Sequence, residues 1–232
     1  IARPLAFCPG CTHRNFYWAI QKVRRRLGGK LVVSGDIGCY SLGIFYNRSM
    51  NSMQAMGSGI GAANGLGQLS RWGQDAKIVA VAGDSTFFHG CLPGLVNARH
   101  HSSNFTFIVL DNKTTAMTGF QPHPGSYRKE QMKRNVSIEE MVAAVEPDFL
   151  KRVDSEDIDT LIDTLHSTVK KNGLKVLIVD SVCRLEERKR TKGRQNYSII
   201  EIDYSKCRGE ECRICVRDFG CTALSWNKTK QV

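Results

Sequence analysis

The chain has 232 residues, 41% of them hydrophobic, and its 33 Lys and Arg against 22 Asp and Glu give a formal net charge of +11. This length suits one sizeable core with a small appendage, and no apolar run reaches the ~20 residues that span a bilayer. The nine cysteines include CxxC spacings, which without a secretion signal favour metal binding over disulfides. We therefore expect a cytoplasmic protein with reduced thiols and no membrane association.

Short apolar runs rich in β-branched residues predict strands that are buried on both faces of a parallel sheet. They cover residues 30–35, 77–83, 105–111 and 175–180. The segments between and around them predict helices over 13–27, 57–72, 90–101, 137–145 and 155–171, the last starting at Ser155. This order predicts an α/β fold, a mostly parallel sheet with helices on both faces.

A final strand over 197–203 leads into a short Cys-rich C-terminal segment, which includes "CRGEECRICVRDFGC". The change in composition divides the chain into a domain over 1–202 and a segment over 203–232. In open α/β sheets, ligands bind outside the carboxyl ends of the strands. We therefore look for the site in residues 36–39, 84–89 and 112–121 and at Cys183.

The segment "GDSTFF" follows one strand and "DNKTT" follows the next. Mg²⁺ prefers oxygen ligands and usually keeps phosphate oxygens among them. The Asp84 carboxylate, the Asn112 amide oxygen and a main-chain carbonyl near Thr114 supply three such ligands. Gly83 and Ser85 would bring backbone N–H groups and a helix N-terminus towards the phosphates. The Gly-Asp pair is weak evidence alone, and the Asn at this interval strengthens it.

This pattern resembles the diphosphate-binding motif of thiamine diphosphate enzymes. Five stretches, "CPGCTHR", "SGDIGCYSLG", "MGSGIGAANG", "AGDSTFFHGCLPGL" and "LDNKTTAMTGFQPHPG", together resemble the catalytic half of the indolepyruvate:ferredoxin oxidoreductases. These belong to the 2-oxoacid:ferredoxin oxidoreductases, and the resemblance runs from about residue 3 to 200. It implies a thiamine diphosphate-binding fold that binds this cofactor with Mg²⁺. The residues that it assigns to the cofactor are Ile37, Gly38, Cys39, Met56, Gly57, Gly83, Asp84, Ser85, Asn112, Thr114, Ala116, Met117 and Thr118.

Two of the cysteines, Cys8 and Cys11, form a CxxC on a Pro-Gly turn, and Cys39 and Cys183 lie at the expected rim of the sheet. Iron–sulfur clusters are held by four Cys thiolates that need not be adjacent in sequence. The resemblance implies that these four hold a [4Fe–4S] cluster near the thiazolium ring. Zinc bound by the same thiolates is the structural alternative.

The tail carries a second set: Cys207, Cys212, Cys215 and Cys221. Their spacing departs from the bacterial ferredoxin pattern C-x₂-C-x₂-C-x₃-C-P, and Thr222 stands where that pattern has proline. The related enzymes end in ferredoxin-like segments, so a second iron–sulfur cluster is one hypothesis and zinc is the other. We interpret Cys91 as a packing residue.

Among the other polar residues, His89 and His123 lie in the stretches that carry the resemblance and are candidates for substrate or proton handling. Each could equally orient a loop. Asp36 lies on the rim, where we expect it to make local hydrogen bonds rather than to act in catalysis.

The resemblance implies a function: oxidative decarboxylation of a 2-oxoacid, an aryl pyruvate such as indolepyruvate, to acyl-CoA and CO₂. Coenzyme A is a co-substrate, and electrons pass through iron–sulfur clusters to ferredoxin. We do not find the pyrimidine-binding domain that activates thiamine diphosphate. We therefore expect a pyrimidine-binding subunit or domain and a gamma-type subunit as partners in a hetero-oligomer, and no activity from this chain alone.

Two other functions stay open. One is a non-oxidative thiamine diphosphate-dependent decarboxylase with structural zinc. The other is nucleic-acid binding, suggested by the basic segments 22–26 and 186–194 but unsupported by any recognition motif. Our hypothesis for the basic loop 186–194 is a docking surface for acidic ferredoxin, through Arg188, Lys189 and Arg190.

Overall fold

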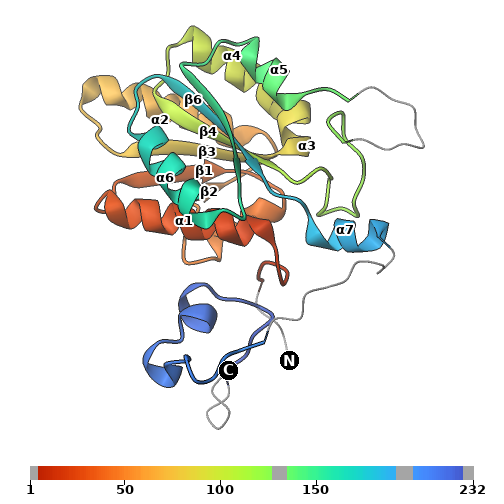
Figure 1. Cartoon of the computed structure of the whole chain (residues 1–232). Coiled ribbons are helices and arrows are strands. Elements are labelled where there is room, and N and C mark those ends of the chain that lie inside the picture. The colour runs from red at the N-terminus through yellow and green to blue at the C-terminus, as the bar shows by residue number, and fades with distance from the viewer. Residues whose placement is uncertain (1–4, 127–134, 192–200, 227–232) are drawn as a thin grey trace.

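A single parallel sheet of six strands, in the order β2-β1-β3-β4-β6-β5, forms the centre of the molecule (Figure 1). The computed structural model describes residues 5–126, 135–191 and 201–226. The strands are β1 (Leu31–Gly35), β2 (Ser52–Met53), β3 (Lys77–Gly83), β4 (Phe105–Asp111), β5 (Phe149–Asp154) and β6 (Leu174–Asp180). The strand pairs are all parallel, which confirms the predicted sheet.

The four predicted strands are confirmed as β1, β3, β4 and β6, whereas β2 and β5 were missed. β2 has only two residues and presents no apolar run. β5 lies at the sheet edge and is only partly buried, so its sequence tolerates Lys151 and Arg152 in the middle of the strand. Both strands form because their neighbours offer pairing groups, which a search for buried runs does not detect.

The predicted helices are confirmed, with small shifts at their ends. The longer helices are α1 (Thr12–Arg26), α2 (Ser58–Gln68), α4 (Leu92–His100), α5 (Ile138–Ala143) and α6 (Ile158–Val169). Shorter turns are η1 (Cys39–Ile44), η2 (Leu69–Trp72), α3 (Asp84–Thr86), η3 (Phe87–Cys91), η5 (Gly209–Glu211) and η6 (Ile214–Asp218).

Two sequence predictions about helix bounds were wrong. The last helix does not start at Ser155, because Asp157 caps α6 by accepting the N–H of Thr160 at 3.1 Å. The start of the basic loop 186–194 is helical, as α7 (Arg184–Arg190). Its acidic first turn and basic last turn complement the helix dipole, and Glu186 pairs with Arg190 at 3.0 Å one turn later. Residues 192–194 lie outside the described residues.

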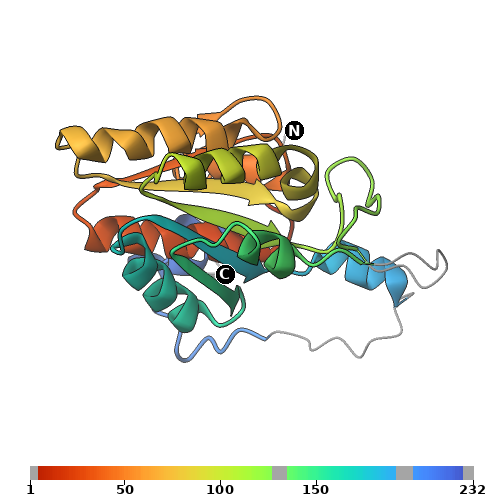
Figure 2. The ribbon, with the colours of Figure 1, turned by 90° about the horizontal axis from the view of Figure 1, so that it is seen from above.

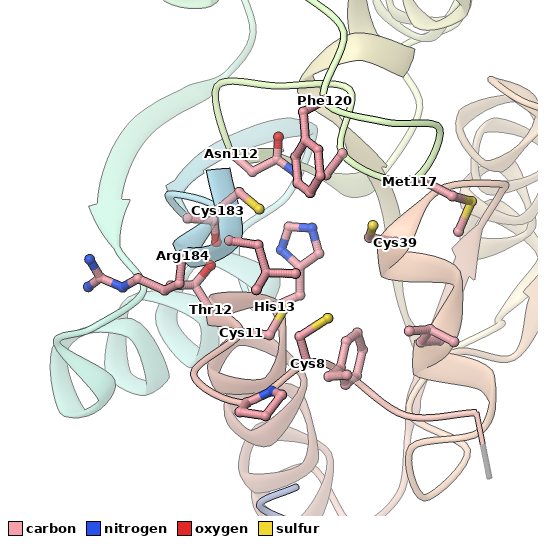
Figure 3. Close-up of a pocket in the computed structure, with 16 residues that line it drawn as sticks. Cys8, Cys11, Thr12, His13, Cys39, Asn112, Met117, Phe120, Cys183 and Arg184 are labelled. Carbon is pink, nitrogen blue, oxygen red and sulfur yellow. The ribbon is translucent and has the colours of Figure 1, made fainter. Parts of the chain in front are cut away.

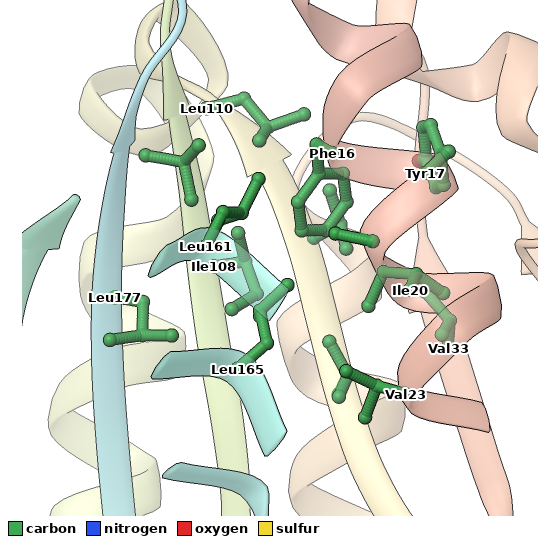
Figure 4. Close-up of a cluster of buried hydrophobic side chains, with 14 of the residues drawn as sticks. Phe16, Tyr17, Ile20, Val23, Val33, Ile108, Leu110, Leu161, Leu165 and Leu177 are labelled. Atoms are coloured by element: carbon green, nitrogen blue, oxygen red, sulfur yellow. The ribbon is translucent and has the colours of Figure 1, made fainter. Parts of the chain in front are cut away.

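One hydrophobic layer joins α1 and α6 to the sheet (Figure 4). Phe16, Tyr17 and Ile20 of α1 and Leu161 of α6 are completely buried against strand residues such as Ile108. Each such side chain contributes about 1.5–3 kcal/mol of hydrophobic free energy. This layer fixes the start of α1, and with it the turn that carries Cys8 and Cys11.

The opposite layer is formed by α2, η3, α4 and α5, so that helices cover both faces of the sheet as predicted (Figures 1 and 2). Ile60, Phe87 and Leu95 are buried here against Phe107 of β4. A Cβ on Gly59 would lie 3.0 Å from the backbone of Gly35, so α2 packs directly on the end of β1.

The C-terminal Cys-rich segment lies outside the sheet, below α1 and the first described residues (Figure 1). The predicted strand over 197–203 is not present at residues 201–203, and its other residues lie outside the described part. Among the described residues, no helix is both long and apolar enough to cross a membrane.

Candidate functional site

The carboxyl ends of β1, β3, β4 and β6 meet at one edge of the sheet. The chain runs from β1 to β2 on one side and then returns to place β3 on the other side of β1. This change of direction creates the kind of crevice in which α/β proteins bind ligands. The segments that follow these strands therefore face one another, as the sequence predicts.

A cavity of about 330 Å³ opens at this edge, and we call it the rim cavity. Every residue predicted to bind thiamine diphosphate lines it except Gly57. Gly57 precedes α2 with a left-handed φ of 80°, and a Cβ there would lie 2.8 Å from the carbonyl oxygen of Gly90. Gly57 is therefore needed where two backbone segments approach closely.

Asp84 stands at the start of a helical stretch directly after β3 and is 1% exposed. Its Oδ1 accepts the N–H of Ser85 at 2.7 Å, and its Oδ2 accepts the N–H of Lys113 at 2.6 Å. Burial raises the pKa of Asp84, whereas His123 and the N–H of Ser85 act in the opposite direction. A bound cation would also favour the charged carboxylate.

Asn112 and Thr114 border the rim cavity beside Asp84. The Oδ1 of Asn112 accepts the N–H of Thr114 at 3.0 Å, which holds the turn after β4 in place. A carboxylate and an amide oxygen on one wall, with main-chain groups nearby, form a donor set that fits Mg²⁺.

An ion-pair network stabilises the turn after β4. Arg152 donates to Oδ2 of Asp111 at 2.9 Å and to Oδ2 of Asp180 at 3.1 Å, and its other nitrogens bind Glu139. The Lys113 ammonium also binds Asp111, and Lys113 itself has a positive φ of 65°. The network thus fixes Lys113, whose N–H donates to the Asp84 carboxylate.

The two candidate histidines occupy different environments. His89 is exposed, lies in the π-helical turn η3 and lines the rim cavity. His123 is buried with its Nε2 3.0 Å from Oδ2 of Asp84, and its Nδ1 accepts the N–H of Gly125 at 3.1 Å. Its ring stacks on Phe88 with centroids 5.6 Å apart. His89 therefore lines the rim cavity, whereas His123 contacts Asp84 from a position outside the wall of this cavity.

Asp36 makes local hydrogen bonds, as expected from the sequence. The buried carboxylate accepts the hydroxyl of Tyr40 and the N–H of Gly59, the latter at 3.4 Å. The Tyr40 hydroxyl also lies 3.0 Å from Oγ1 of Thr86. A Cβ on Gly38 would lie 2.3 Å from the Tyr40 ring. The sequence reading missed Tyr40, whose ring fills the space under Gly38 and lines the rim cavity.

A second cavity, of about 280 Å³, lies beside the first, and we call it the thiol cavity (Figure 3). Cys8, Cys11, Cys39 and Cys183 all line it. They come from the turn before α1, the start of η1 and the residue before α7. Cys39 also lines the rim cavity, so this cysteine stands where the two cavities meet.

The thiols of this cavity influence one another. Burial raises the pKa of Cys11 to about 12, against the effect of the N–H groups of His13 and Arg14, and the charges of Cys8 and Cys39 add to the rise. Burial, Cys183 and Cys8 raise the pKa of Cys39 to about 11. Metal binding requires thiolates, so a metal at this site would displace protons.

In the described part of the chain, no three His, Cys, Asp or Glu side chains converge tightly enough to hold a single metal ion. The four thiols are therefore distributed around the wall of the thiol cavity. In a [4Fe–4S] cluster, each of four thiolates binds a different iron, so a wall of thiols around an apolar space fits such a group.

The sequence reading also missed His13, although it lies in the quoted stretch "CPGCTHR". Its side chain is 2% exposed and projects into the thiol cavity (Figure 3). Burial lowers the pKa of His13 to about 4. A His two residues after a CxxC is the signal that could have identified it.

The tail cysteines Cys207, Cys212, Cys215 and Cys221 are all partly exposed. The N–H of Cys221 donates to the carbonyl oxygen of Cys215 at 2.9 Å, which closes the turn around η6. The N–H of Ile214 and the Arg208 side chain lower the pKa of Cys212, which favours its thiolate. Cys91, in contrast, is completely buried in the layer around α4, as expected for a packing residue.

The tail docks on α1 through Phe219 and Thr222. The Phe219 ring packs edge-on against Trp18 with centroids 5.6 Å apart, and its carbonyl oxygen accepts the Tyr46 hydroxyl at 2.9 Å. The Thr222 hydroxyl donates to the carbonyl oxygen of Phe7 at 3.0 Å. Because Phe7 precedes Cys8 and Thr222 follows Cys221, this contact joins the chain beside Cys8 to the chain beside Cys221.

Residues 36–179 match the family model of the thiamine pyrophosphate enzymes, C-terminal TPP binding domain. The chain is 37% identical to the IorA subunit of indolepyruvate oxidoreductase from Thermococcus kodakarensis, over 97% of this chain and 36% of the relative. The subunit of the same name from Pyrococcus horikoshii is 36% identical, over 99% of this chain and 37% of the relative. The chain thus spans about a third of the length of these relatives.

The fold also resembles a solved structure, the 2-oxoglutarate:ferredoxin oxidoreductase from Magnetococcus marinus with 2-oxoglutarate, coenzyme A and succinyl-CoA bound. The TM-score is 0.65 with 18% sequence identity, over 79% of this chain and 66% of that chain. The match supports the α/β architecture described above. The family model and the IorA relatives confirm the resemblance inferred from the five sequence stretches.

Proposed function

Since the chain belongs to the thiamine pyrophosphate enzymes, as their C-terminal TPP binding domain, we propose that it is the catalytic cofactor-binding part of a 2-oxoacid:ferredoxin oxidoreductase. The substrate is an aryl pyruvate such as indolepyruvate, which is oxidatively decarboxylated to acyl-CoA and CO₂. The IorA relatives are named as subunits of indolepyruvate oxidoreductase, which supports this substrate class. Residues 1–202 form the cofactor-binding domain, and residues 203–232 form an iron–sulfur segment.

The observation that carries the proposal is the position of Cys39 on the walls of both cavities. A decarboxylase that transfers no electrons has no need for a thiol-lined cavity beside its cofactor site. An oxidoreductase needs a one-electron acceptor close to the reacting cofactor, and Cys39 would hold that acceptor at the shared wall.

In the rim cavity, Asp84 and Asn112 would hold Mg²⁺ with a main-chain group near Thr114. The bound thiamine diphosphate supplies the carbanion-stabilising chemistry. The protein residues position it: the N–H groups of Ser85 and Lys113 orient the Asp84 carboxylate, and the Gly83 backbone leaves room beside the Tyr40 ring. His89 is the exposed titratable group of this wall, and we assign it to proton handling near the substrate.

In the thiol cavity, Cys8, Cys11, Cys39 and Cys183 would hold a [4Fe–4S] cluster. A second cluster would be held by Cys207, Cys212, Cys215 and Cys221. The contact between Thr222 and Phe7 supports an electron path from the first set to the second.

The relatives are named as subunits of indolepyruvate oxidoreductase, which supports a function carried out with partners. We propose a cytoplasmic hetero-oligomer with a pyrimidine-binding subunit or domain and a gamma-type subunit. Ferredoxin would accept the electrons. Its docking site would include α7, where Lys189 lies over the Phe120 ring at 3.8 Å and Phe120 lines the thiol cavity.

Anaerobic purification of the whole complex tests this function. We expect about four irons and four sulfides for the thiol cavity, bound thiamine diphosphate, and ferredoxin reduction that depends on an aryl pyruvate and coenzyme A. A colourless zinc protein that releases an aldehyde without reducing ferredoxin would instead identify a non-oxidative decarboxylase. Activity of the isolated chain would contradict the need for partners.

A further inference from the structure

Two side chains on the wall of the thiol cavity each have a buried polar atom without a hydrogen-bond partner in the described part of the chain. They are His13, whose Nδ1 is buried without a partner among the described residues, and Ser181, whose Oγ is in the same condition. His13 is 2% exposed and Ser181 is 0% exposed. A buried polar group without a partner costs about 1–3 kcal/mol, so both groups call for a hydrogen-bond partner.

The backbone holds both side chains at the cavity. The N–H of Ser181 donates to the carbonyl oxygen of Asp111 at 3.0 Å, which continues the β4–β6 pairing beyond the strand end. His13 lies in the first turn of α1, where the neighbouring Thr12 hydroxyl contacts the carbonyl oxygen of Val182 at 3.4 Å. The two residues are therefore held in the cavity wall, each two residues from a cavity cysteine, Cys11 or Cys183.

The guanidinium of this wall is already engaged in ion pairs. The Arg184 guanidinium pairs with Glu187 at 2.7 Å and also with Glu156. Arg14, which follows His13, turns away and donates to the carbonyl oxygen of Phe7 at 2.6 Å. His13 and Ser181, in contrast, are available to a group that fills the cavity.

We propose that His13 and Ser181 donate hydrogen bonds to sulfur atoms of the cluster held in the thiol cavity and thereby raise its reduction potential. This inference rests on the proposed function, since it requires a cluster at this site. An imidazole carries an N–H in either tautomer, and a serine hydroxyl rotates to suit its acceptor. Reduction adds one electron to the cluster, which makes its sulfurs more negative, so the donors stabilise the reduced form more than the oxidised form.

The test uses the whole complex, purified anaerobically, with the variants H13F, H13Q and S181A. Potentiometric titration followed by EPR gives the midpoint potential, and the signal that disappears in C39A identifies the cluster of the thiol cavity. We expect H13F and S181A each to lower the ratio of reduced to oxidised cluster roughly tenfold at a fixed potential. For a one-electron couple this corresponds to a midpoint potential that is lower by about 59 mV. H13Q, which keeps an N–H donor, should stay near the wild-type value.

Ser155 offers a matched control. Its Oγ is also buried without a partner among the described residues, but Ser155 is not on the thiol-cavity wall. S155A should therefore leave the potential unchanged. H100F, at an exposed position on α4, is the corresponding control for the imidazole.

Unchanged potentials in H13F and S181A, with iron and sulfide intact, would overturn this inference alone. Loss of iron in every His13 variant would also overturn it, because it would make His13 a ligand. A wild-type complex with no iron at the thiol cavity would overturn the proposed function itself, and these outcomes are distinguished by the iron and sulfide analysis.

Discussion

The Nε2 of His123 lies 3.0 Å from the Oδ2 of Asp84, and both side chains are almost completely buried. The N–H of Lys113 binds the same carboxylate oxygen. The imidazole thus limits how the Asp84 carboxylate turns towards the rim cavity. Partners behind a metal ligand commonly affect metal affinity 10–100-fold.

His123→Phe should weaken Mg²⁺–thiamine diphosphate binding by about 10–100-fold, because the carboxylate loses one of the groups that orient it. Calorimetric titration of the cofactor measures this. His123→Gln, which retains an N–H donor, should recover part of the affinity. Equal binding by His123→Phe and the wild type would show that the contact has no role in cofactor binding.

Asp84→Asn should bind the cofactor about 10–100-fold more weakly while the protein stays folded, because a neutral amide is a poorer Mg²⁺ ligand than a carboxylate. Asp163→Asn is the control, since Asp163 forms an exposed ion pair with Arg26 on the surface. Similar losses in both variants, measured by cofactor titration, would argue against a metal site at Asp84.

Cys39→Ala should remove the cluster of the thiol cavity and abolish electron transfer, while thiamine diphosphate still binds in the rim cavity. Iron analysis and cofactor titration on the same sample measure the two effects separately. Cys91→Ala is the matched control, because Cys91 is buried in the opposite helix layer. A cluster that survives in Cys39→Ala would show that the ligand assignment is wrong.

Phe219→Ala should loosen the tail from α1, since it removes the ring contact with Trp18. For a half-buried aromatic side chain we expect the free energy that holds the tail on α1 to fall by about 1–2 kcal/mol. Proteolysis of residues 203–226 should then be roughly tenfold faster. Ile214→Ala, at a position 43% exposed, should leave the rate unchanged. A tail equally resistant in Phe219→Ala would mean that other contacts hold it.

Lys175 should make the folding stability pH-dependent in the alkaline range. Its ammonium is buried at the amino end of β6 and donates to Oδ1 of Asn104 at 2.8 Å, and burial lowers its pKa from 10.5 to about 8. The unfolded chain therefore binds more protons than the folded chain between these pH values, so stability rises with pH there.

For the wild type relative to Lys175→Met, we expect the free energy of unfolding to increase by about 2 kcal/mol from pH 8 to pH 10. Urea denaturation at both pH values gives the difference between the two proteins. The comparison with the variant removes the contribution of the cysteines that titrate in the same range. Parallel pH profiles for the two proteins would show that Lys175 does not titrate in this window.

The sequence by itself determined the central strands and the residues at their carboxyl ends. A run such as 105–111 is apolar throughout because both faces of its strand are covered, and this is a local signal. The motifs around Asp84 and Asn112, together with Cys39 and Cys183, could also be placed on the rim, because parallel strands end at the same edge. Cys8 and Cys11 follow no strand, and only the family resemblance added them to this set.

Only the tertiary structure decided how these residues face one another. It placed Cys39 between two cavities, His123 against Asp84, His13 and Ser181 among the thiols, and Phe219 on Trp18. These pairs are distant in sequence, and their meeting depends on strand order and on how the two helix layers pack. No local pattern records such contacts, because packing at this level is set by the shapes of many side chains at once.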